Sequence, residues 1–311
     1  MILITGGLGM IGMHTARHLL DMGEEVVLTQ YQVRRQPDFL EADLGKRAFV
    51  EQLDVMDADA LTALGSRYKF TGIAHLAAPG LGALGPADDY KLNVTGLLNV
   101  LQAAEAWGVK RLSLASSIGI YAGVKQGPFR EDEPLRMHGG GHVEVYKKMF
   151  EILGAHYAQR TGLDVVMLRI GGIYGPMDHN LFNVVTRFLH LALGREVPNW
   201  PGELFSEDAN DLCYVRDCAR GIALLQTAEK LNHVCYNVAT GVASNIGQVA
   251  AAVQARIPEA KLPVTPGRGP NYRPNPSMVI DRITADTGYR PQFTLEQSVD
   301  DFLAWLQTHP Q

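Results

Sequence analysis

A glycine-rich turn near the start of the chain most restricts what this sequence can fold into. Residues 2–4 (ILI) suit a buried strand, and a helix with one apolar side begins after Gly9. Between them the glycines keep the spacing T-G-x-x-G-x-x-G. Glycines at this spacing turn the chain tightly, let the backbone approach a pyrophosphate and pack the helix on the strand, while free N–H groups at the helix start hold the phosphates. The turn predicts a dinucleotide site that comprises Gly6, Gly9, Met10, Ile11 and Gly12.

Apolar runs alternate with helical patterns through the first part of the chain. Strands are expected at 25–28, 49–53, 72–78, 111–117 and 163–168, and helices at 88–107 and 142–160. Regular alternation of this kind implies a doubly wound parallel sheet. We therefore expect an α/β fold with a Rossmann-type dinucleotide-binding domain at 1–175.

The pattern becomes irregular after Pro176. We expect helices at 180–193, 217–226, 245–255 and 295–306, and strands at 212–215 and 234–238. Asp217 is expected to cap the second of these helices, and proline and glycine are dense from 258 to 276. We interpret 176–311 as a smaller α/β substrate-binding lobe, with an element around 212–240 that returns to the main domain.

Composition excludes several classes of function. The chain has 311 residues, 46% of them hydrophobic, and a net charge of −5 with acidic and basic residues interleaved, so neither nucleic acid nor membrane is an expected partner. Cys213, Cys218 and Cys235 lack metal-ligand spacing and suit a reducing compartment, so no metal is expected. The opening apolar residues fit the first strand rather than a leader, and we expect a cytoplasmic protein that acts on a small molecule.

The end of the second strand bears on the choice of dinucleotide. An acidic residue normally ends this strand and binds the ribose hydroxyls of the adenosine. Here the strand continues into the neutral Gln30. Arg34 and Arg35 follow, where they could pair with a 2′-phosphate, although two loop arginines equally suit a solvated surface. These residues leave both NAD and NADP open.

The third and fourth strands complete the expected cofactor site. The third strand ends where it can approach an adenine, and the fourth ends in small side chains that allow a ligand to come close to the backbone. The cofactor residues expected at these strand ends are Asp54, Val55, Leu76, Ala77 and Ala78.

Two polar residues beside these strand ends have alternative interpretations. His75 is expected to be a packed histidine rather than a catalyst. Asn93 interrupts the apolar side of the helix at 88–107, which indicates a hydrogen-bonding role at the cofactor site. A capped or solvated asparagine would give the same pattern.

Seven ordered segments together resemble a known family. They are TGGLGMIG (5–12), LDVMD (53–57), HLAA (75–78), NVTGLLNVLQAA (93–104), SSIGIY (116–121), LRIGGIYGP (168–176) and YVRDCARGI (214–222). The chain resembles the extended short-chain dehydrogenase/reductases, the NAD(P)-dependent epimerase/dehydratase family that acts largely on nucleotide sugars. This resemblance implies an oxidoreductase or isomerase, a homodimer, a cofactor over the carboxyl edge of the sheet with NAD slightly preferred, and a substrate between cofactor and lobe.

The resemblance also implies where the catalytic residues lie. The family uses a hydroxyl residue, a tyrosine, and a lysine four residues after the tyrosine on one helix, whose charge favours the tyrosinate that takes the substrate proton. Ser117 matches the hydroxyl residue. The family's spacing from the glutamate to the glycine before the next strand fits Glu151 and Gly162, which places the lysine on Lys147 and the tyrosine on Val143.

Valine cannot transfer a proton, so three interpretations remain. The acid/base is another group such as His142 or Tyr146, the reaction needs none, or catalysis has been lost and the chain is a dinucleotide-binding protein or a non-redox lyase or isomerase. Tyr146 lies about 100° round the helix from Lys147. We favour Lys147 as a ligand of the cofactor ribose, against the alternative that it is a solvated surface lysine.

Residues of the expected substrate site also come from the resemblance. Tyr121, which follows the SSIG segment, is structural or substrate-lining in the family, and Asn180 is expected in the substrate lobe. Arg268, and more weakly Arg273, fit a position where similar proteins place an arginine against a nucleotide-sugar diphosphate. Both arginines would equally fit an exposed loop.

Overall fold

A seven-stranded parallel sheet organises the protein. The computed structural model describes residues 1–32, 35, 38–78, 84–138, 140–199 and 202–309. Within them the strand order is β3-β2-β1-β4-β5-β6-β9, and every adjacent pair is parallel. The strands are β1 (Ile2–Thr5), β2 (Val26–Gln30), β3 (Ala48–Gln52), β4 (Gly72–His75), β5 (Arg111–Ser117), β6 (Val165–Ile170) and β9 (Cys235–Val238).

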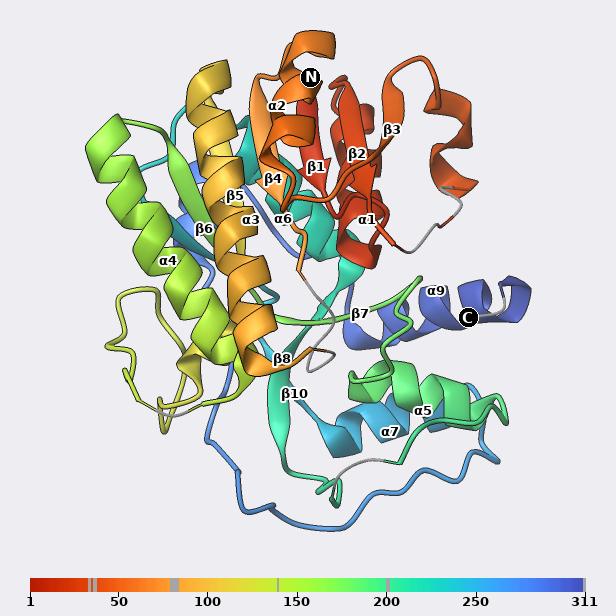
Figure 1. Ribbon diagram of the computed structural model, residues 1–311. Coiled ribbons are helices and arrows are strands. Elements are labelled where there is room, and N and C mark those ends of the chain that lie inside the picture. The colour runs from red at the N-terminus through yellow and green to blue at the C-terminus, as the bar shows by residue number, and fades with distance from the viewer. Residues whose placement is uncertain (33–34, 36–37, 79–83, 139, 200–201, 310–311) are drawn as a thin grey trace.

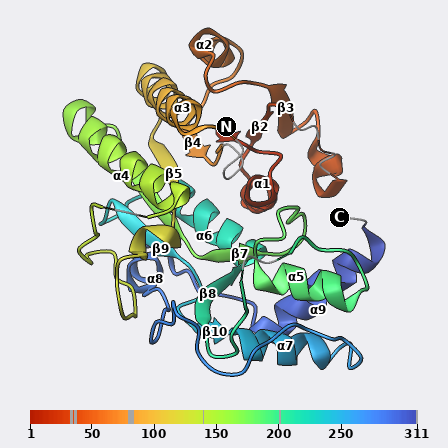
Figure 2. The same cartoon turned by 60° about the horizontal axis from the view of Figure 1, so that its bottom comes forward.

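Helices cover both faces of this sheet, which confirms the predicted doubly wound fold (Figure 1). One face is covered by α2 (Ala58–Arg67), α3 (Pro86–Trp107) and α4 (His142–Thr161). The other is covered by α1 (Met10–Asp21) and α6 (Val215–Thr227), which pack on each other (Figure 2). Short 3₁₀ helices follow two strands: η1 (Asp38–Asp43) and η2 (Ile118–Tyr121).

A smaller lobe lies at the carboxyl end of the sheet (Figure 1). Its sheet has the order β10-β8-β7, with β7 (Gly172–Tyr174) and β8 (Ala209–Tyr214) parallel and β10 (Ala243–Asn245) antiparallel to β8. Aromatic and aliphatic side chains of α5 (Val184–Ala192), α7 (Ile246–Gln254) and α9 (Leu295–Thr308) form its core. The segment 215–238 leaves this lobe, because α6 packs on α1 and β9 extends the main sheet. Later in the chain, α8 (Asp281–Thr287) also packs on β9 and α6.

Two predicted helix starts are wrong. The helix expected from 180 begins at Val184, because the Asn183 side chain caps it by accepting from Val185 N at 2.9 Å. Asp217 does not cap α6, which begins after Tyr214. Its buried carboxylate instead accepts from backbone N–H groups of Gln292 and Phe293, and so ties α6 to the segment before α9.

The parallel strands end at one edge, next to the lobe. Thr5, Gln30, His75 and Ser117 are the last residues of β1, β2, β4 and β5. Strands of this kind end where doubly wound sheets bind ligands. The fold therefore gathers residues from distant parts of the chain at the edge that faces the smaller lobe.

Candidate functional site

The glycine-rich turn has the geometry of a phosphate loop. Gly6 has φ +66°, and a Cβ there would lie 2.9 Å from the Ala77 backbone. A Cβ on Gly12 would lie 2.6 Å from the carbonyl oxygen of Gly6. Gly9 N donates to the same oxygen at 2.9 Å, and α1 begins after Gly9 with neither an acidic residue in its first turn nor a side-chain cap. The first N–H groups of α1, next to half-buried Met10, are therefore available to bind an anion.

The end of β4 is fixed against this turn. Thr5 Oγ1 and His75 Nδ1 are 2.7 Å apart, and Thr5 Oγ1 also accepts from Ala77 N at 3.3 Å. His75 is buried, and burial, with the Lys147 charge as a second cause, lowers its pKa to about 3. His75 is therefore a neutral packed residue. Leu76 and Ala77, which follow it, are half-buried, and Ala78 is exposed.

At the adenosine end the structure describes Gln30 and Asp54, whereas Arg34 lies outside the described residues. Gln30 Oε1 is buried without a hydrogen-bond partner among them. Asp54 Oδ1 accepts from Met56 N at 2.9 Å and shapes the turn after β3. An orphaned buried acceptor beside the phosphate loop is a position that a ribose hydroxyl can satisfy.

An asparagine that the sequence analysis did not single out holds this turn. Asn99 Nδ2 donates to the carbonyl oxygens of Val55 and Met56 at 2.9 and 3.1 Å. By contrast, the predicted cofactor residue Asn93 is buried and donates within α3 to the Asp89 carbonyl at 2.8 Å. The signal that could have identified Asn99 is its position as a second polar residue on the side of α3 that packs on residues 54–57.

Ser117 and Val143 face the same space at the end of β5. A Cβ on Gly119 would lie 3.4 Å from Ser117 Oγ and 3.6 Å from Val143 Cγ1. Ser117 Oγ also accepts from Gly119 N at 3.0 Å, which leaves its O–H free to donate. The residue at the family's tyrosine position therefore borders on the predicted hydroxyl, but as an apolar side chain.

Lys147 lies one helical turn after Val143 on α4. Its Nζ is 4.9 Å from the centre of the Phe150 ring, and no described carboxylate forms an ion pair with it. Burial lowers the pKa of Lys147 to about 8. A desolvated ammonium at this edge can donate to ligand hydroxyls or lose its proton at mildly alkaline pH.

Tyr146 and His142 lie elsewhere on α4. Tyr146 packs edge-on against Tyr90 of α3, with ring centres 5.3 Å apart, and the exposed His142 stacks on it at 6.4 Å. The Tyr146 hydroxyl is buried without a hydrogen-bond partner among the described residues, and burial with the nearby Asp89 raises its pKa to about 12. The structure thus brings Ser117, Val143 and Lys147 together, but not Tyr146 or His142.

Tyr121 belongs to the buried scaffold behind Ser117. It is fully buried, and its hydroxyl accepts from Arg169 Nη1 at 2.9 Å and donates to Asn237 Oδ1 at 2.8 Å. Arg169 in turn forms an ion pair with Glu151, which accepts from Ser116 Oγ at 2.6 Å. Both hydrogen-bonding capacities of the phenol are therefore used inside the protein, and no surface of it is left for a substrate.

The arginines of the lobe differ in their partners. Arg268 has a side chain that is 61% exposed, and it forms an ion pair with Glu207 at 2.7 Å. Arg273 is half-buried over the Phe129 ring, donates to the Tyr121 carbonyl at 3.1 Å and has no described carboxylate partner. Asn180 is exposed at the turn before α5, where its backbone N donates to Asp178. Arg273 thus lies next to η2, and no described carboxylate neutralises its charge.

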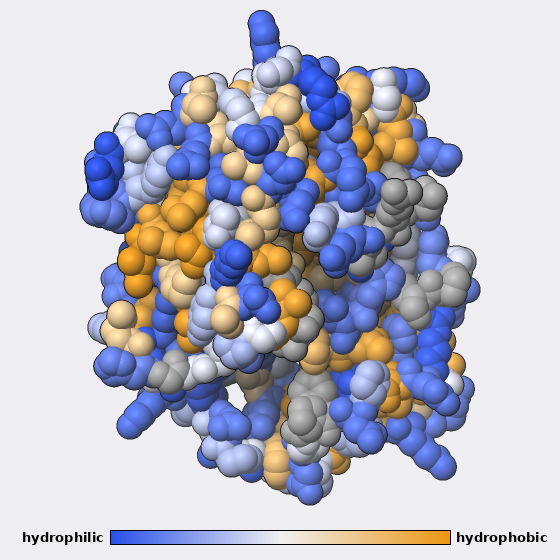
Figure 3. Space-filling model, viewed as in Figure 1, coloured by the Kyte–Doolittle hydropathy of each residue, from blue (hydrophilic) through white to orange (hydrophobic). Residues whose placement is uncertain are grey.

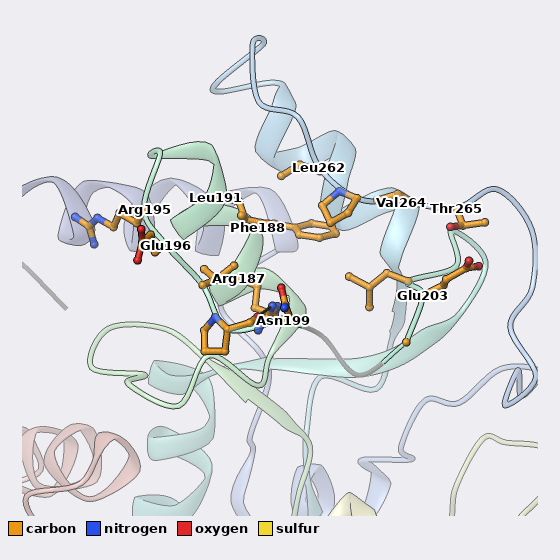
Figure 4. A pocket seen from close by; sticks show the side chains of 15 residues that line it. Arg187, Phe188, Leu191, Arg195, Glu196, Asn199, Glu203, Leu262, Val264 and Thr265 are labelled. Carbon is orange, nitrogen blue, oxygen red and sulfur yellow. Dashed lines mark hydrogen bonds between the residues drawn. The ribbon is translucent and has the colours of Figure 1, made fainter.

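A separate pocket of about 800 Å³ lies within the lobe (Figure 4). Its lining comes from residues within 187–199, 202–204 and 262–265, including Phe188, Leu191, Arg195 and Val264. None of the predicted site residues lines it. Among the described residues, no group of three or more His, Cys, Asp or Glu could hold a metal ion, and no helix is long and apolar enough to cross a membrane.

A phosphate loop, a hydroxyl and a lysine at the carboxyl edge of a doubly wound sheet define a dinucleotide-binding protein of the short-chain dehydrogenase type. A model of the NAD dependent epimerase/dehydratase family matches residues 2–239, so the chain belongs to that family. This membership confirms the predicted class of enzyme and a nicotinamide dinucleotide as its cofactor.

Curated relatives and solved structures agree with this assignment. Mouse UDP-glucose 4-epimerase is 27% identical over 99% of this chain and 97% of its own length. UDP-glucuronate 4-epimerase of Thermodesulfobacterium geofontis is 31% identical over 70% of this chain and 69% of its own. The Thermus thermophilus UDP-glucose 4-epimerase complex with NAD superposes with a TM-score of 0.74 at 26% identity, covering 97% of this chain and 98% of that one.

Proposed function

We propose that this protein is an NAD-dependent enzyme that epimerises a nucleotide sugar through a transient oxidation. The observation that carries this proposal is the meeting of the phosphate loop, Ser117 and Lys147 at one edge of the sheet, in a chain whose relatives are UDP-sugar epimerases. The cofactor, when bound, supplies the hydride acceptor. We retain the division into a dinucleotide-binding part (1–175) and a substrate-binding lobe (176–311) as part of the proposal.

The chain's own residues have three proposed tasks. Lys147 donates to the ribose hydroxyls of the cofactor, which does not require the missing tyrosine. Ser117 donates its free O–H to the substrate oxygen that changes charge. Arg273 pairs with the diphosphate, supported by its lack of a described carboxylate partner, whereas Arg268 is exposed and paired with Glu207, and Asn180 is exposed.

The proton of the substrate hydroxyl needs an acceptor other than a phenol. Val143 cannot serve, and Tyr146 packs against α3 with a pKa raised to about 12. Lys147 is on the Val143 side of α4, and burial has lowered its pKa to about 8, close to the range in which a base works well. We therefore propose that Lys147 also takes this proton.

Conversion of nucleotide sugars by the purified protein tests the epimerase proposal directly. Purified protein with NAD would be incubated separately with UDP-glucose, UDP-galactose and UDP-glucuronate, and epimer formation followed by chromatography. We expect one pair to interconvert, and Lys147→Met to abolish conversion. Lack of any conversion, with NAD bound, would reject the epimerase proposal for these sugars.

A second candidate is a cofactor-binding protein without redox turnover, and Val143 is the observation that favours it. Val143→Tyr separates the two, because it restores a phenol next to Ser117. If the native chain neither interconverts these sugars nor changes the 340 nm absorbance of its cofactor with them, and Val143→Tyr does, the binding-protein interpretation is correct.

We further propose a homodimer and a cytoplasmic location. A dimer is supported by large side chains exposed on α3 and α4: Tyr90 (39%), Leu98 (39%) and Ile152 (56%). Figure 3 shows an area of hydrophobic residues on the left of the molecule. The location is supported by three buried cysteines that form no disulfide. Sedimentation of the native protein and of Ile152→Glu tests the dimer.

A further inference from the structure

We propose that Glu144 is a positioning residue for the proposed reaction: by binding Arg136 and Lys148 it fixes the first turn of α4, and with it Val143, relative to Ser117. The inference rests on the proposed function, in which the sugar reacts beside Ser117. It assigns Glu144 a role that acts through the backbone of α4 rather than through contact with the substrate.

The first turn of α4 is one wall of the space beside the Ser117 hydroxyl. Ser117 Oγ and Val143 Cγ1 would lie 3.4 and 3.6 Å from a Cβ on Gly119. The backbone N of Glu144 would lie 4.0 Å from the same Cβ. Movement of this turn would therefore change the room next to the hydroxyl. Because a displacement of about 1 Å near a reacting group can lower a rate about 100-fold, the position of the turn matters for the proposed reaction.

The local sequence does little to fix this turn. The helix α4 begins after Gly141, which provides no side-chain cap. Gly140, which precedes it, has φ +109°, a conformation that favours glycine. A helix start that lacks a capping side chain and follows glycine has few local restraints on its backbone. The first turn of α4 thus depends on contacts from elsewhere in the chain.

Glu144 makes these contacts with two cations. Its side chain is 3% exposed. Arg136 donates from Nε to Oε1 at 3.0 Å and from Nη2 to Oε2 at 2.8 Å. Lys148, one helical turn later, donates to Oε1 at 2.6 Å and to the Arg136 carbonyl at 2.5 Å. Hydrogen bonding from Arg136, and then from Lys148, lowers the pKa of Glu144, so the carboxylate stays charged. Bidentate charge-assisted bonds of this kind fix geometry as well as adding stability.

Arg136 connects this carboxylate to the backbone that follows η2. A Cβ on Gly123, two residues after η2 ends, would lie 2.5 Å from Arg136 Cδ, so the stem of the arginine lies directly on this backbone. A Cβ on Gly140 would lie 2.0 Å from Glu144 Oε2, so the carboxylate occupies room that only glycine leaves. Since Ser117 is the residue before η2, Arg136 and Glu144 join the two backbone segments that border the Ser117 hydroxyl.

A second ion pair of the chain provides a matched comparison. Glu51 of β3 accepts from Nη1 and Nη2 of Arg67 at 2.8 and 2.9 Å. The Glu51 side chain is 16% exposed and the Arg67 side chain 55% exposed. This pair is bidentate like that of Glu144 and Arg136, but it joins β3 to the end of α2 and borders on neither Ser117 nor Val143. Glu51→Gln is therefore the control for loss of an ion pair as such.

Thiol labelling of a Val143→Cys variant tests the inference without any substrate. The three native cysteines are buried, so a small alkylating reagent reaches the new thiol first in the folded chain. Adding Glu144→Gln, which keeps the shape and removes the charge, should raise the labelling rate at this thiol at least about fivefold, because the turn opens more often. Arg136→Met, which keeps the stem over Gly123, should act in the same direction, and Arg136→Lys should raise the rate less than Arg136→Met does.

Kinetics with the native Val143 test the consequence for the reaction. For the sugar that the protein converts, Glu144→Gln should lower kcat about tenfold, because the reacting oxygen is less precisely oriented beside Ser117. The dissociation constants of NAD and UDP should change less than about threefold, since the phosphate loop and the lobe are proposed to hold most of each ligand. Glu51→Gln should change neither the labelling rate nor kcat by more than about twofold.

Four outcomes overturn the inference. They are a labelling rate that Glu144→Gln and Arg136→Met leave unchanged, an equal rise with Glu51→Gln, a kcat that Glu144→Gln leaves unchanged, and labelling of the buried native cysteines in Glu144→Gln, which would show that the whole fold has loosened. If the native protein binds NAD but converts none of the sugars, the epimerase proposal fails separately, and the labelling rates alone decide whether Glu144 fixes the turn.

Discussion

Glu151 Oε2 and Arg169 Nη2 form an ion pair of 2.8 Å between α4 and β6, with side chains 13% and 7% exposed. Ser116 donates to the same carboxylate, and Arg169 donates to Tyr121. The pair therefore fixes the helix that carries Val143 and Lys147 relative to the strand end that carries Ser117.

Removing one partner of this pair should be costly. Glu151→Ala leaves the Arg169 guanidinium buried without its counter-ion, which we expect to lower the free energy of unfolding by about 3–5 kcal/mol. Asp300→Ala removes the partner of Arg256 in an exposed pair (57% and 23% exposed) and should cost less than about 1 kcal/mol. Urea unfolding measures both, and equal costs would show that the Glu151 pair does not hold the site together.

The phosphate loop should not tolerate a methyl group at Gly12. Alanine favours helices over glycine by about 1 kcal/mol, but its Cβ would lie 2.6 Å from Gly6 O and 2.7 Å from the Gly7 backbone, which cannot rotate away. Displacing the loop at a cost of about 1–3 kcal/mol should weaken dinucleotide binding about tenfold. Gly85→Ala, where a Cβ meets nothing within 4 Å, is the control. Unchanged affinity in Gly12→Ala would mean that the dinucleotide does not use this turn.

Local sequence signals predicted the fold best where one segment determines its own structure. The glycine-rich turn near the start of the chain was predicted because its strand, glycines and helix are contiguous in the sequence. The helical period alone predicted that Tyr146 points away from Lys147. The helix α2 was missed although Asp57 caps it by accepting from Ala60 N at 2.9 Å and buried Leu61 and Leu64 mark its inner side.

Contacts between residues far apart in the sequence determine the parts of the fold and of the site that the sequence did not predict. The strands β7 and β10 have three residues each and exist only through pairing with β8, so no local pattern marks them. Arg273 reaches the Tyr121 carbonyl across 152 positions of sequence, and Asp217 binds amides 75 and 76 positions away. Spacing along the chain cannot reveal which loop arginine keeps its charge unpaired, or that an acidic residue near a helix start serves another element.

Lys147 should make stability depend on alkaline pH. Its pKa is lowered from 10.5 to about 8 by burial, so between these values the unfolded chain holds a proton that the folded chain has lost. Stability therefore rises with pH in this window, by up to about 3 kcal/mol at about 1.4 kcal/mol per pKa unit. Lys147→Met removes this contribution. The difference in unfolding free energy between native protein and variant should thus shift in favour of the native protein from pH 7 to pH 10, and a constant difference would show that the ammonium is solvated.

Ser117 and Ser116 are adjacent but should behave differently when changed to alanine. Ser116 Oγ donates to buried Glu151, so Ser116→Ala should lower stability by about 1 kcal/mol and leave ligand binding unchanged. Ser117 is half-buried, and among the described residues its hydroxyl accepts from Gly119 N and donates to none. Ser117→Ala should lower sugar turnover or affinity about fivefold to tenfold, since one hydrogen bond to a substrate oxygen is worth about 1 kcal/mol and more if charge develops there. Dinucleotide affinity and melting temperature should stay nearly constant. If Ser117→Ala instead lowers the melting temperature without changing kinetics, its hydroxyl serves only to cap η2, and the space shared with Val143 is not where the reaction takes place.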